Sequence, residues 1–197
     1  LEWHGEHLPL GLDGLVAEAF AARLAGETGA VLLPCMWLPV TTLPHPASIQ
    51  VPSDVVRGTV TALLSALSGA GAQTVCLVTG HYAQGHMIEL YRAASEGVAS
   101  GVSVLAGTPL EPLNDPTLLD HAARWETAQL LTSRPDLVWT DALGPDPAPA
   151  SDAVLGENPR LARLDEGENV TRRALDAWQR WIDSPGDLLA HYRAAEA

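Results

Sequence analysis

Apolar residues recur along this chain at two spacings, and each spacing predicts a different kind of element. Helical spacing of apolar side chains covers residues 13–26 and returns over residues 53–68. A third helix is expected to follow the loop at residues 79–86 and to end near Ser95. Residues 168–182 are amphipathic, which predicts a helix that packs on a sheet or on a partner subunit.

Short continuous apolar runs lie between these helical segments and predict buried strands. They occupy residues 30–36, 74–78 and 102–106, and a further short one is expected at residues 137–139. Strands that alternate with helices and are apolar on both faces are typical of a parallel sheet with right-handed crossovers. The sequence therefore predicts an α/β fold with three layers, α/β/α, around a mostly parallel central sheet.

The remaining segments read as loops or irregular structure. Residues 37–52 are rich in proline and are expected to form a pocket wall, and residues 142–152 form a second proline-rich loop. Asp115-Pro116 opens a helical stretch that includes His121 and Trp125-Glu126-Thr127. Because neither an internal repeat nor a domain linker is visible, residues 1–197 are expected to form a single domain, which at this length can bury a sizeable core.

Composition excludes some functions and leaves others open. The chain has 197 residues and a net charge of −13, and all of its basic residues are arginine. This charge argues against nucleic acid or an anionic membrane as a partner, but not against divalent cations. Cys35 and Cys76 lie in apolar runs, as buried thiols do, which favours a reducing, cytoplasmic setting. No apolar run is long enough to span a membrane, and the first residues lack a signal-peptide pattern.

Metal-binding residue types are concentrated at the start of the sequence. In an extended segment, Glu2 and His4 project to the same side, about 7 Å apart, and could converge on one cation. Asp13 follows a proline–glycine turn at the start of a helix, from which its carboxylate could point to the same centre. The alternatives are a solvated surface for Glu2 and His4 and a simple N-cap for Asp13.

Two further groups of polar residues follow later in the chain. His81 comes directly after a predicted strand, and sites in parallel sheets form at the carboxyl ends of strands. His86 is expected to start the next helix or to line its exposed side. On a continuous helix, His121 and Glu126 would be about 140° apart, so they can meet only if the helix begins between them. Trp125 beside Glu126 is more often a core residue than a substrate lid.

These motifs, in this order, resemble those of the creatininase family of metal-dependent amidohydrolases. The resemblance lies in Glu2-x-His4-Gly5 with Asp13 after it, in Thr79-Gly80-His81, and in His121-x4-Glu126-Thr127. Weaker similarity extends to residues 30–34, 135–138 and 156–162. Together they cover most of the chain, and only the strand expected before Glu2 is lacking.

The resemblance implies a site with two divalent metal ions, of zinc, manganese or iron, and with Asp13 as the bridging ligand. The implied protein ligands are Glu2, His4, Asp13, His81 and Glu126. Two such ions lower the pKa of a shared water and give a hydroxide nucleophile. The resemblance assigns proton transfer to His121, and Glu126 is expected to serve catalysis as well as metal binding. Trp37, Tyr82 and Trp125 are expected to contact the substrate.

The expected function is hydrolysis of a non-peptide or cyclic amide C–N bond in a small molecule. The alternatives are a deformylase acting on a formamidopyrimidine, a peptidase that trims a precursor peptide, and a catalytically inactive metal-binding homologue. The sequence departs from the family pattern at Ala83, where creatinine-hydrolysing members have an acidic residue, and at Trp37, where a glycine is usual. The resemblance also implies a homo-oligomer built on dimers, since members of the family are typically hexameric.

Overall fold

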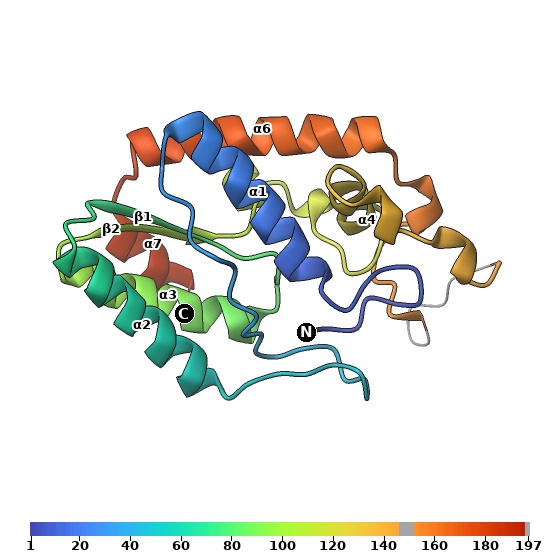
Figure 1. Cartoon of the computed structure of the whole chain (residues 1–197), viewed down its shortest axis with the longest axis horizontal. Helices are drawn as coiled ribbons and strands as arrows, with labels where there is room; N and C mark the ends of the chain where they lie inside the picture. Colours follow the sequence, from blue (N-terminus) through green and yellow to red (C-terminus); the bar gives the residue numbers. More distant parts are fainter. Residues whose placement is uncertain (146–151, 196–197) are drawn as a thin grey trace.

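The computed structural model describes residues 1–145 and 152–195, and Figure 1 shows how the elements are arranged. The described helices are α1 (Leu12–Thr28), α2 (Ser53–Gly69), α3 (Gln84–Ala99), α4 (Arg124–Leu131), α6 (Leu164–Asp183) and α7 (Leu188–Ala195). The described strands are β1 (Thr74–Val78) and β2 (Ser103–Gly107). Single 3-10 turns occupy Glu111–Leu113, Pro116–Leu118, Pro135–Leu137, Thr140–Ala142 and Pro159–Leu161.

The two described strands form one parallel sheet. Thr74 pairs with Ser103 and Val78 pairs with Gly107. Helix α3 connects the strands, so the predicted strand–helix–strand order is confirmed, with β2 displaced by one residue from the expected run. A crossover of this kind brings the carboxyl ends of both strands to the same edge of the sheet.

Helices cover both faces of the sheet, which gives the predicted three-layer α/β/α arrangement. Val104 and Ala106 of β2 belong to a buried cluster with residues of α2, α3 and α7, whereas Leu105 belongs to a second cluster with residues of α1 and α6. Figure 1 shows α1 and α6 on one side of the strands and α2 and α3 on the other. The alternation follows from strand geometry, since successive side chains point to opposite faces.

Helix α6 packs on the sheet, as its amphipathic pattern predicts, although it begins before residue 168. Trp178 is fully buried in the cluster that contains Leu105. Its Nε1–H donates to the carbonyl of Pro109 at 3.1 Å, and its ring meets the ring of Phe20 edge-on at 6.2 Å. The helix therefore connects the sheet to α1 and to the segment that follows β2.

Gly167 allows α6 to approach α4 closely, and this contact gives a stability prediction. A Cβ at Gly167 would lie 2.1 Å from the carbonyl oxygen of Ala128 in α4. We expect Gly167→Ala to lower the free energy of unfolding by about 1–3 kcal/mol, because the two backbones must separate. Urea unfolding measures this change. Gly26→Ala in α1 is the matched control: nothing lies within 4 Å of its Cβ, so stability should be unchanged or slightly higher.

Helix ends differ from the expected ones by a few residues. Gly26 does not stop α1, which continues to Thr28 and ends where Gly29 adopts a left-handed conformation with φ of +73°. The left-handed conformation of Gly29 turns the chain out of the helix, while its N–H still bonds to the carbonyl of Ala25. The sequence pattern did not predict α7.

The strand expected at residues 30–36 is not formed, and this prediction is wrong. Val31 is 88% exposed, and the segment makes no strand pairing with any described residue. Within the described part, β1 pairs with β2 alone, so its other edge has no neighbour. An apolar cavity of about 600 Å³ lies between that edge, α1, α2 and residues 30–36. An apolar run becomes a strand only where another strand pairs with its backbone.

The strand expected at residues 137–139 is also wrong. Pro135–Leu137 forms a 3-10 turn with proline at its start. The N–H of Trp139 donates to the carbonyl of His7 at 2.9 Å, and the Trp139 side chain is 66% exposed. Proline at the start of a helical turn is favourable, so the local sequence forms a turn in place of a buried strand.

Residues 146–151 of the expected loop at 142–152 lie outside the described residues. In the described ranges, none of the helices combines the length and the apolar character that crossing a membrane requires.

Candidate metal centre

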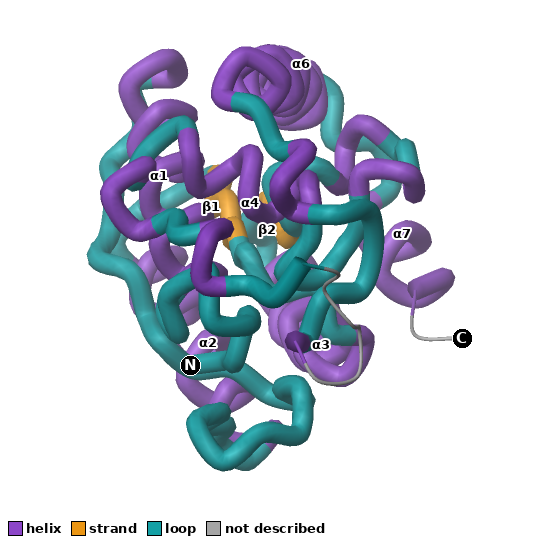
Figure 2. The backbone as a smooth tube through the Cα atoms, turned by 90° about the vertical axis from the view of Figure 1, so that its right-hand side faces the viewer, coloured by secondary structure: helices purple, strands orange, loops and turns teal. Residues whose placement is uncertain are grey.

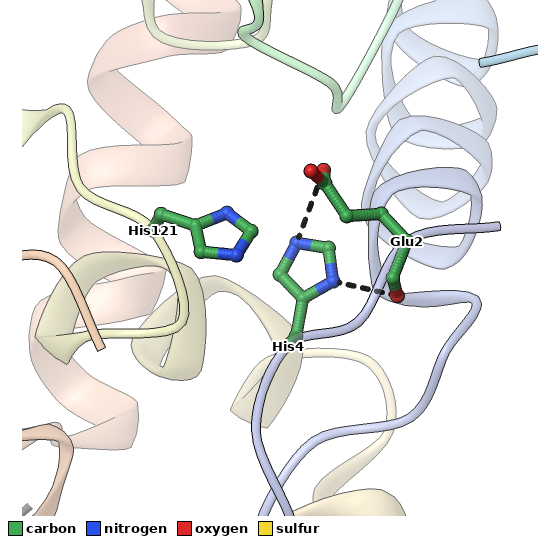
Figure 3. Close-up of side chains that lie close together, drawn as sticks. All are labelled: Glu2, His4 and His121. Carbon is green, nitrogen blue, oxygen red and sulfur yellow. Dashed lines mark hydrogen bonds and ion pairs between the residues drawn. The ribbon is translucent and has the colours of Figure 1, made fainter. Parts of the chain in front are cut away.

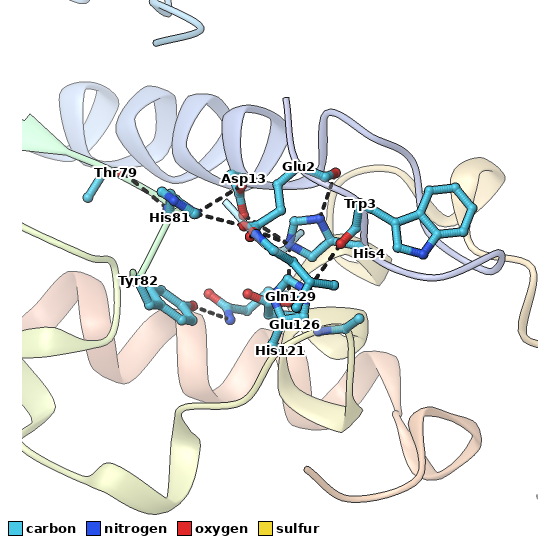
Figure 4. Close-up of polar contacts among 12 residues, drawn as sticks. Glu2, Trp3, His4, Asp13, Thr79, His81, Tyr82, His121, Glu126 and Gln129 are labelled. Carbon is cyan, nitrogen blue, oxygen red and sulfur yellow. Dashed lines mark hydrogen bonds and ion pairs between the residues drawn. The ribbon is translucent and has the colours of Figure 1, made fainter. Parts of the chain in front are cut away.

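Six polar side chains that the sequence analysis selected come together beside the carboxyl end of β1 and the first turns of α1 and α4 (Figure 4). They are Glu2, His4, Asp13, His81, His121 and Glu126. Four of the six are buried, and Asp13 and His121 are partly exposed. Figure 2 shows this end of the molecule, where loops and helix ends gather around the two strands.

Glu2 and His4 lie on the same side of an extended segment, as side-chain alternation predicts. Glu2 Oε2 lies 4.0 Å from His4 Nε2. His4 Nδ1 lies 3.1 Å from the Glu2 carbonyl oxygen, which can only accept, so Nδ1 carries the proton and Nε2 is free to act as a ligand. Gly5, with φ of +74°, then turns the chain at a point where a Cβ would lie 2.6 Å from the carbonyl of Asp152.

The Asp13 carboxylate lies between two histidines. Its Oδ1 lies 3.2 Å from His4 Nε2, and its Oδ2 lies 3.5 Å from His81 Nδ1. Asp13 is the second residue of α1 and does not cap it, because Gly11 occupies the N-cap position. The positive end of the helix dipole favours a carboxylate at this position.

His81 follows β1 at the carboxyl end of the sheet. Its Nε2 lies 2.9 Å from the Val40 carbonyl and therefore carries the proton, and its Nδ1 lies 2.8 Å from Glu2 Oε2. Gly80 explains how the end of β1 comes so close to α1, because a Cβ at Gly80 would lie 2.2 Å from the backbone carbonyl of Asp13. Any larger residue would push the strand end away from the helix.

Helix α4 begins at Arg124, between His121 and Glu126, which is the condition under which these two residues can meet. The helical stretch expected from Asp115 through His121 is wrong, because within the described residues 115–123 only a 3-10 turn at Pro116–Leu118 forms, and His121 lies outside both this turn and α4. Glu126 Oε2 lies 3.5 Å from His4 Nε2 and accepts the backbone N–H of Ala122 at 2.6 Å. Ala122 adopts a positive φ of 51°, and this bend separates His121 from the helix.

The His121 ring lies against the His4 ring, with 4.4 Å between the ring centroids (Figure 3). His121 Nε2 lies 3.1 Å from the carbonyl of Trp3 and carries the proton, so Nδ1 is the basic nitrogen. Reciprocal backbone hydrogen bonds with Leu155, at 3.0 and 2.8 Å, fix the position of His121. Burial and the neighbouring His4 lower the pKa of His121, which favours the neutral imidazole.

The pKa shifts at this site reflect carboxylates and imidazoles held together in a largely buried cluster. Burial lowers the pKa of His4, but the charges of Asp13 and Glu126 outweigh it and raise the pKa to about 9. Burial also lowers the pKa of His81, but its hydrogen bonds to the Asp13 and Glu2 carboxylates and their charges outweigh it and raise the pKa to about 10. Burial raises the pKa of Glu126 to about 8 despite His4. The three carboxylates therefore require positive charge nearby, from protons or from a cation.

The donor atoms fit divalent metal ions. Three sets of ligand atoms each lie within 4.8 Å of one another: Glu2 with Asp13 and His81, His4 with Asp13 and Glu126, and Glu2 with His4 and His121. His4 Nε2 and Asp13 Oδ1 are buried and make no hydrogen bond to any described residue. Carboxylate and imidazole donors without thiolate suit zinc, manganese and iron.

The three expected substrate contacts lie at different places. Trp37 is 43% exposed and lines the apolar cavity, with its ring against Gly11 and Gly14 at the start of α1. Tyr82 follows His81, and its hydroxyl accepts a hydrogen bond from Gln129 Nε2 at 3.1 Å. Trp125 packs against the buried cluster around Trp178 and beneath the Arg124 guanidinium.

Sequence reasoning missed several groups that hold this site together. Two are backbone groups, the Val40 carbonyl and the Leu43 amide, and no residue type signals them. Asp120, which the sequence places with His121 and Glu126 but without a role, accepts the backbone N–H groups of Trp125 and Glu126 and so fixes the start of α4. Gln129 lies one turn after Glu126 on α4, and its place on the same helix face could have indicated it. His86 lies in the first turn of α3 but is buried, so the expectation of an exposed side was wrong.

An α/β fold with carboxylate and imidazole groups gathered at the end of its sheet is typical of metal-dependent enzymes. The model of the creatininase family, described as creatinine amidohydrolase, matches residues 1–182. The chain therefore belongs to the creatininase family, and it is a metal-dependent hydrolase that acts on a C–N bond other than a peptide bond. A comparison with curated protein sequences finds no match.

Solved structures of this family share the fold. A creatinine amidohydrolase (creatininase) structure has a TM-score of 0.76 and 21% sequence identity, over 94% of this chain and 88% of that one. A creatininase with manganese has a TM-score of 0.76 and 20% identity, with the same 94% and 88% coverage. A protein from Bacteroides fragilis described as a putative creatinine amidohydrolase has a TM-score of 0.65 and 20% identity, over 90% and 83%.

Proposed function

We propose that this chain holds two divalent metal ions and hydrolyses a non-peptide or cyclic amide bond of a small molecule. The observation that carries the proposal is the position of Asp13, whose two carboxylate oxygens face different histidines, His4 and His81. A carboxylate placed in this way can bridge two ions. Glu126 and His4 lie on one side of it, and Glu2 and His81 lie on the other.

In this proposal the ligands are Glu2, His4, Asp13, His81 and Glu126, and the ions are zinc, manganese or iron. Ions bound there would supply Lewis-acid chemistry, polarising the amide carbonyl and lowering the pKa of water. Zinc and manganese are supported by two solved creatininases, one described as the Zn-Zn type and one as Mn.

The side chains around the ligands have separate proposed roles. His121, with its protonated Nε2 held by the Trp3 carbonyl, keeps its basic Nδ1 available to take up a proton and pass it to the leaving nitrogen. The Tyr82 hydroxyl accepts a hydrogen bond from Gln129 and can donate its own hydrogen to a substrate. Trp37 forms an apolar wall beside the start of α1. Trp125 directly precedes Glu126 on α4 and packs against the buried cluster around Trp178, where it supports the helix.

We further propose a cytoplasmic homo-oligomer built on dimers, with a hexamer as its largest form. Both cysteines are unpaired thiols, which fits a reducing compartment. Large apolar side chains that are about half exposed or more include those of Trp139, Leu155, Leu161 and Leu164, and such exposure is common where subunits meet.

Metal analysis combined with a substrate panel tests the proposed function. We expect about two equivalents of divalent metal after anaerobic purification, and hydrolysis of a cyclic or non-peptide amide. Chelation should abolish turnover and restored metal should recover it, because bound ions would supply the activation of the water and of the carbonyl. Formamides and short peptides in the same panel distinguish the deformylase and peptidase alternatives. Metal-loaded protein that hydrolyses nothing in the panel would favour the inactive homologue.

A further inference from the structure

Residues 40–43 contact two of the proposed ligands through backbone groups. The Leu43 N–H donates to Glu2 Oε1, while Glu2 Oε2 faces His81. The Val40 carbonyl accepts from His81 Nε2 at 2.9 Å. Each contact uses the atom of the ligand that points away from the proposed ions, which is the position of an outer-shell partner.

Thr41 has the backbone conformation that makes both contacts possible. Its φ is +61°, which is unusual for a residue with a branched side chain. The left-handed turn at Thr41 lies between the two groups, so the Val40 carbonyl and the Leu43 amide both face the site. The Thr41 side chain packs against Gly85. A Cβ at Gly85 would lie 2.2 Å from Thr41 Oγ1, so only glycine leaves room for this contact. Strained backbone persists where the surrounding structure fixes it, often at functional sites.

Residues 45–49, which follow residues 40–43, are attached to residues 1–3, which include the proposed ligand Glu2. The N–H of Ile49 donates to the Leu1 carbonyl at 2.8 Å, and the Leu1 amino group donates to the Ile49 carbonyl at 2.9 Å. The N–H of Trp3 donates to Ser48 Oγ at 3.1 Å, and the His45 ring stacks on the Trp3 ring with centroids 4.2 Å apart. Residues 40–49 form no helix or strand, so these contacts and the ligands hold them in place.

We propose that residues 40–43 are a positioning element for the metal centre, in which the Leu43 amide orients the Glu2 carboxylate and the Val40 carbonyl orients the His81 ring. Metal binding and the order of residues 40–49 are therefore coupled: an ion fixes Glu2 and His81, and these two residues fix the segment. The inference rests on the proposed function, because it concerns the same centre.

Replacing Leu43 separates the amide from the side chain. Leu43→Pro removes the N–H, whereas Leu43→Ala keeps it and serves as the matched control. Equilibrium binding of Zn²⁺ and of Mn²⁺ to each variant, in competition with a chromophoric chelator, is the readout. We expect the proline variant to bind about 10- to 100-fold more weakly than the alanine variant, as loss of outer-shell partners does.

The same two Leu43 variants made in a Glu2→Ala protein distinguish positioning of the carboxylate from a general structural effect of proline on metal binding. In a Glu2→Ala protein the Leu43 amide has no carboxylate to orient, so the proline and alanine variants should bind metal equally. A difference that persists in this background would overturn the positioning role. Equal binding by the two variants when Glu2 is present would also overturn it.

Amide hydrogen exchange on the unmodified chain covers the case in which the proline variant does not fold. Metal loading should slow exchange in residues 40–49, most of all at Leu43, and should leave residues 61–68 of α2 unchanged. Unchanged exchange in residues 40–49 on a metal-loaded protein overturns the inference alone. Failure of the unmodified chain to bind either metal overturns the proposed function and this inference with it.

Discussion

Asp13→Ala is expected to remove both metal ions and to reduce hydrolysis by more than about 100-fold, because a carboxylate facing both His4 and His81 cannot be replaced by a single neighbour. Without it, each proposed ion position loses a ligand, and the two buried histidines lose an anionic partner. Metal content and turnover, measured on the same preparation, test this result.

Asp54→Ala provides the matched control for Asp13. Asp54 is also the second residue of a helix, α2, but it is exposed and lies outside the three sets of ligand atoms. Its loss removes a similar charge from a helix N-terminus and should leave metal content unchanged. Two equivalents of metal retained by Asp13→Ala would exclude a bridging role.

His121→Ala is expected to keep the metal content and to lose about 10²–10⁴-fold in turnover of an amide with a poor leaving group. The five proposed ligands remain in this variant, but the basic Nδ1 beside His4 is gone. An activated anilide, whose leaving nitrogen needs less protonation, should lose much less.

His191→Ala is the matched control for His121→Ala. His191 is exposed and lies on α7, outside the three sets of ligand atoms. His191→Ala should leave both metal content and turnover unchanged. If His121→Ala hydrolyses both classes of amide at the original rate, His121 has no part in proton transfer.

The candidate site was predictable where side-chain chemistry and element geometry agree. Placing His81 at a strand end required only the apolar run before it. The angle between His121 and Glu126 on a helix showed that the helix must begin between them, and α4 does begin at Arg124. Resemblance to a known family added the ligand set as a whole.

The features that were missed depend on contacts that the local sequence does not encode. Residues 30–36 have the composition of a strand, but strand formation requires a paired neighbour, which the described part does not supply. Pro135 converts an apolar run into a turn. The Val40 carbonyl and the Leu43 amide are present in every residue type, so only the fold reveals their use.

The close approach at Gly80 has a consequence for how this centre can vary. The distance between the end of β1 and the first turn of α1 is set by main-chain atoms, because a Cβ at Gly80 would lie 2.2 Å from the Asp13 carbonyl oxygen. Substitution of side chains elsewhere does not act on this distance between β1 and α1. New specificities can therefore arise through changes in the surrounding loops, while the geometry that would hold the ions is inherited intact.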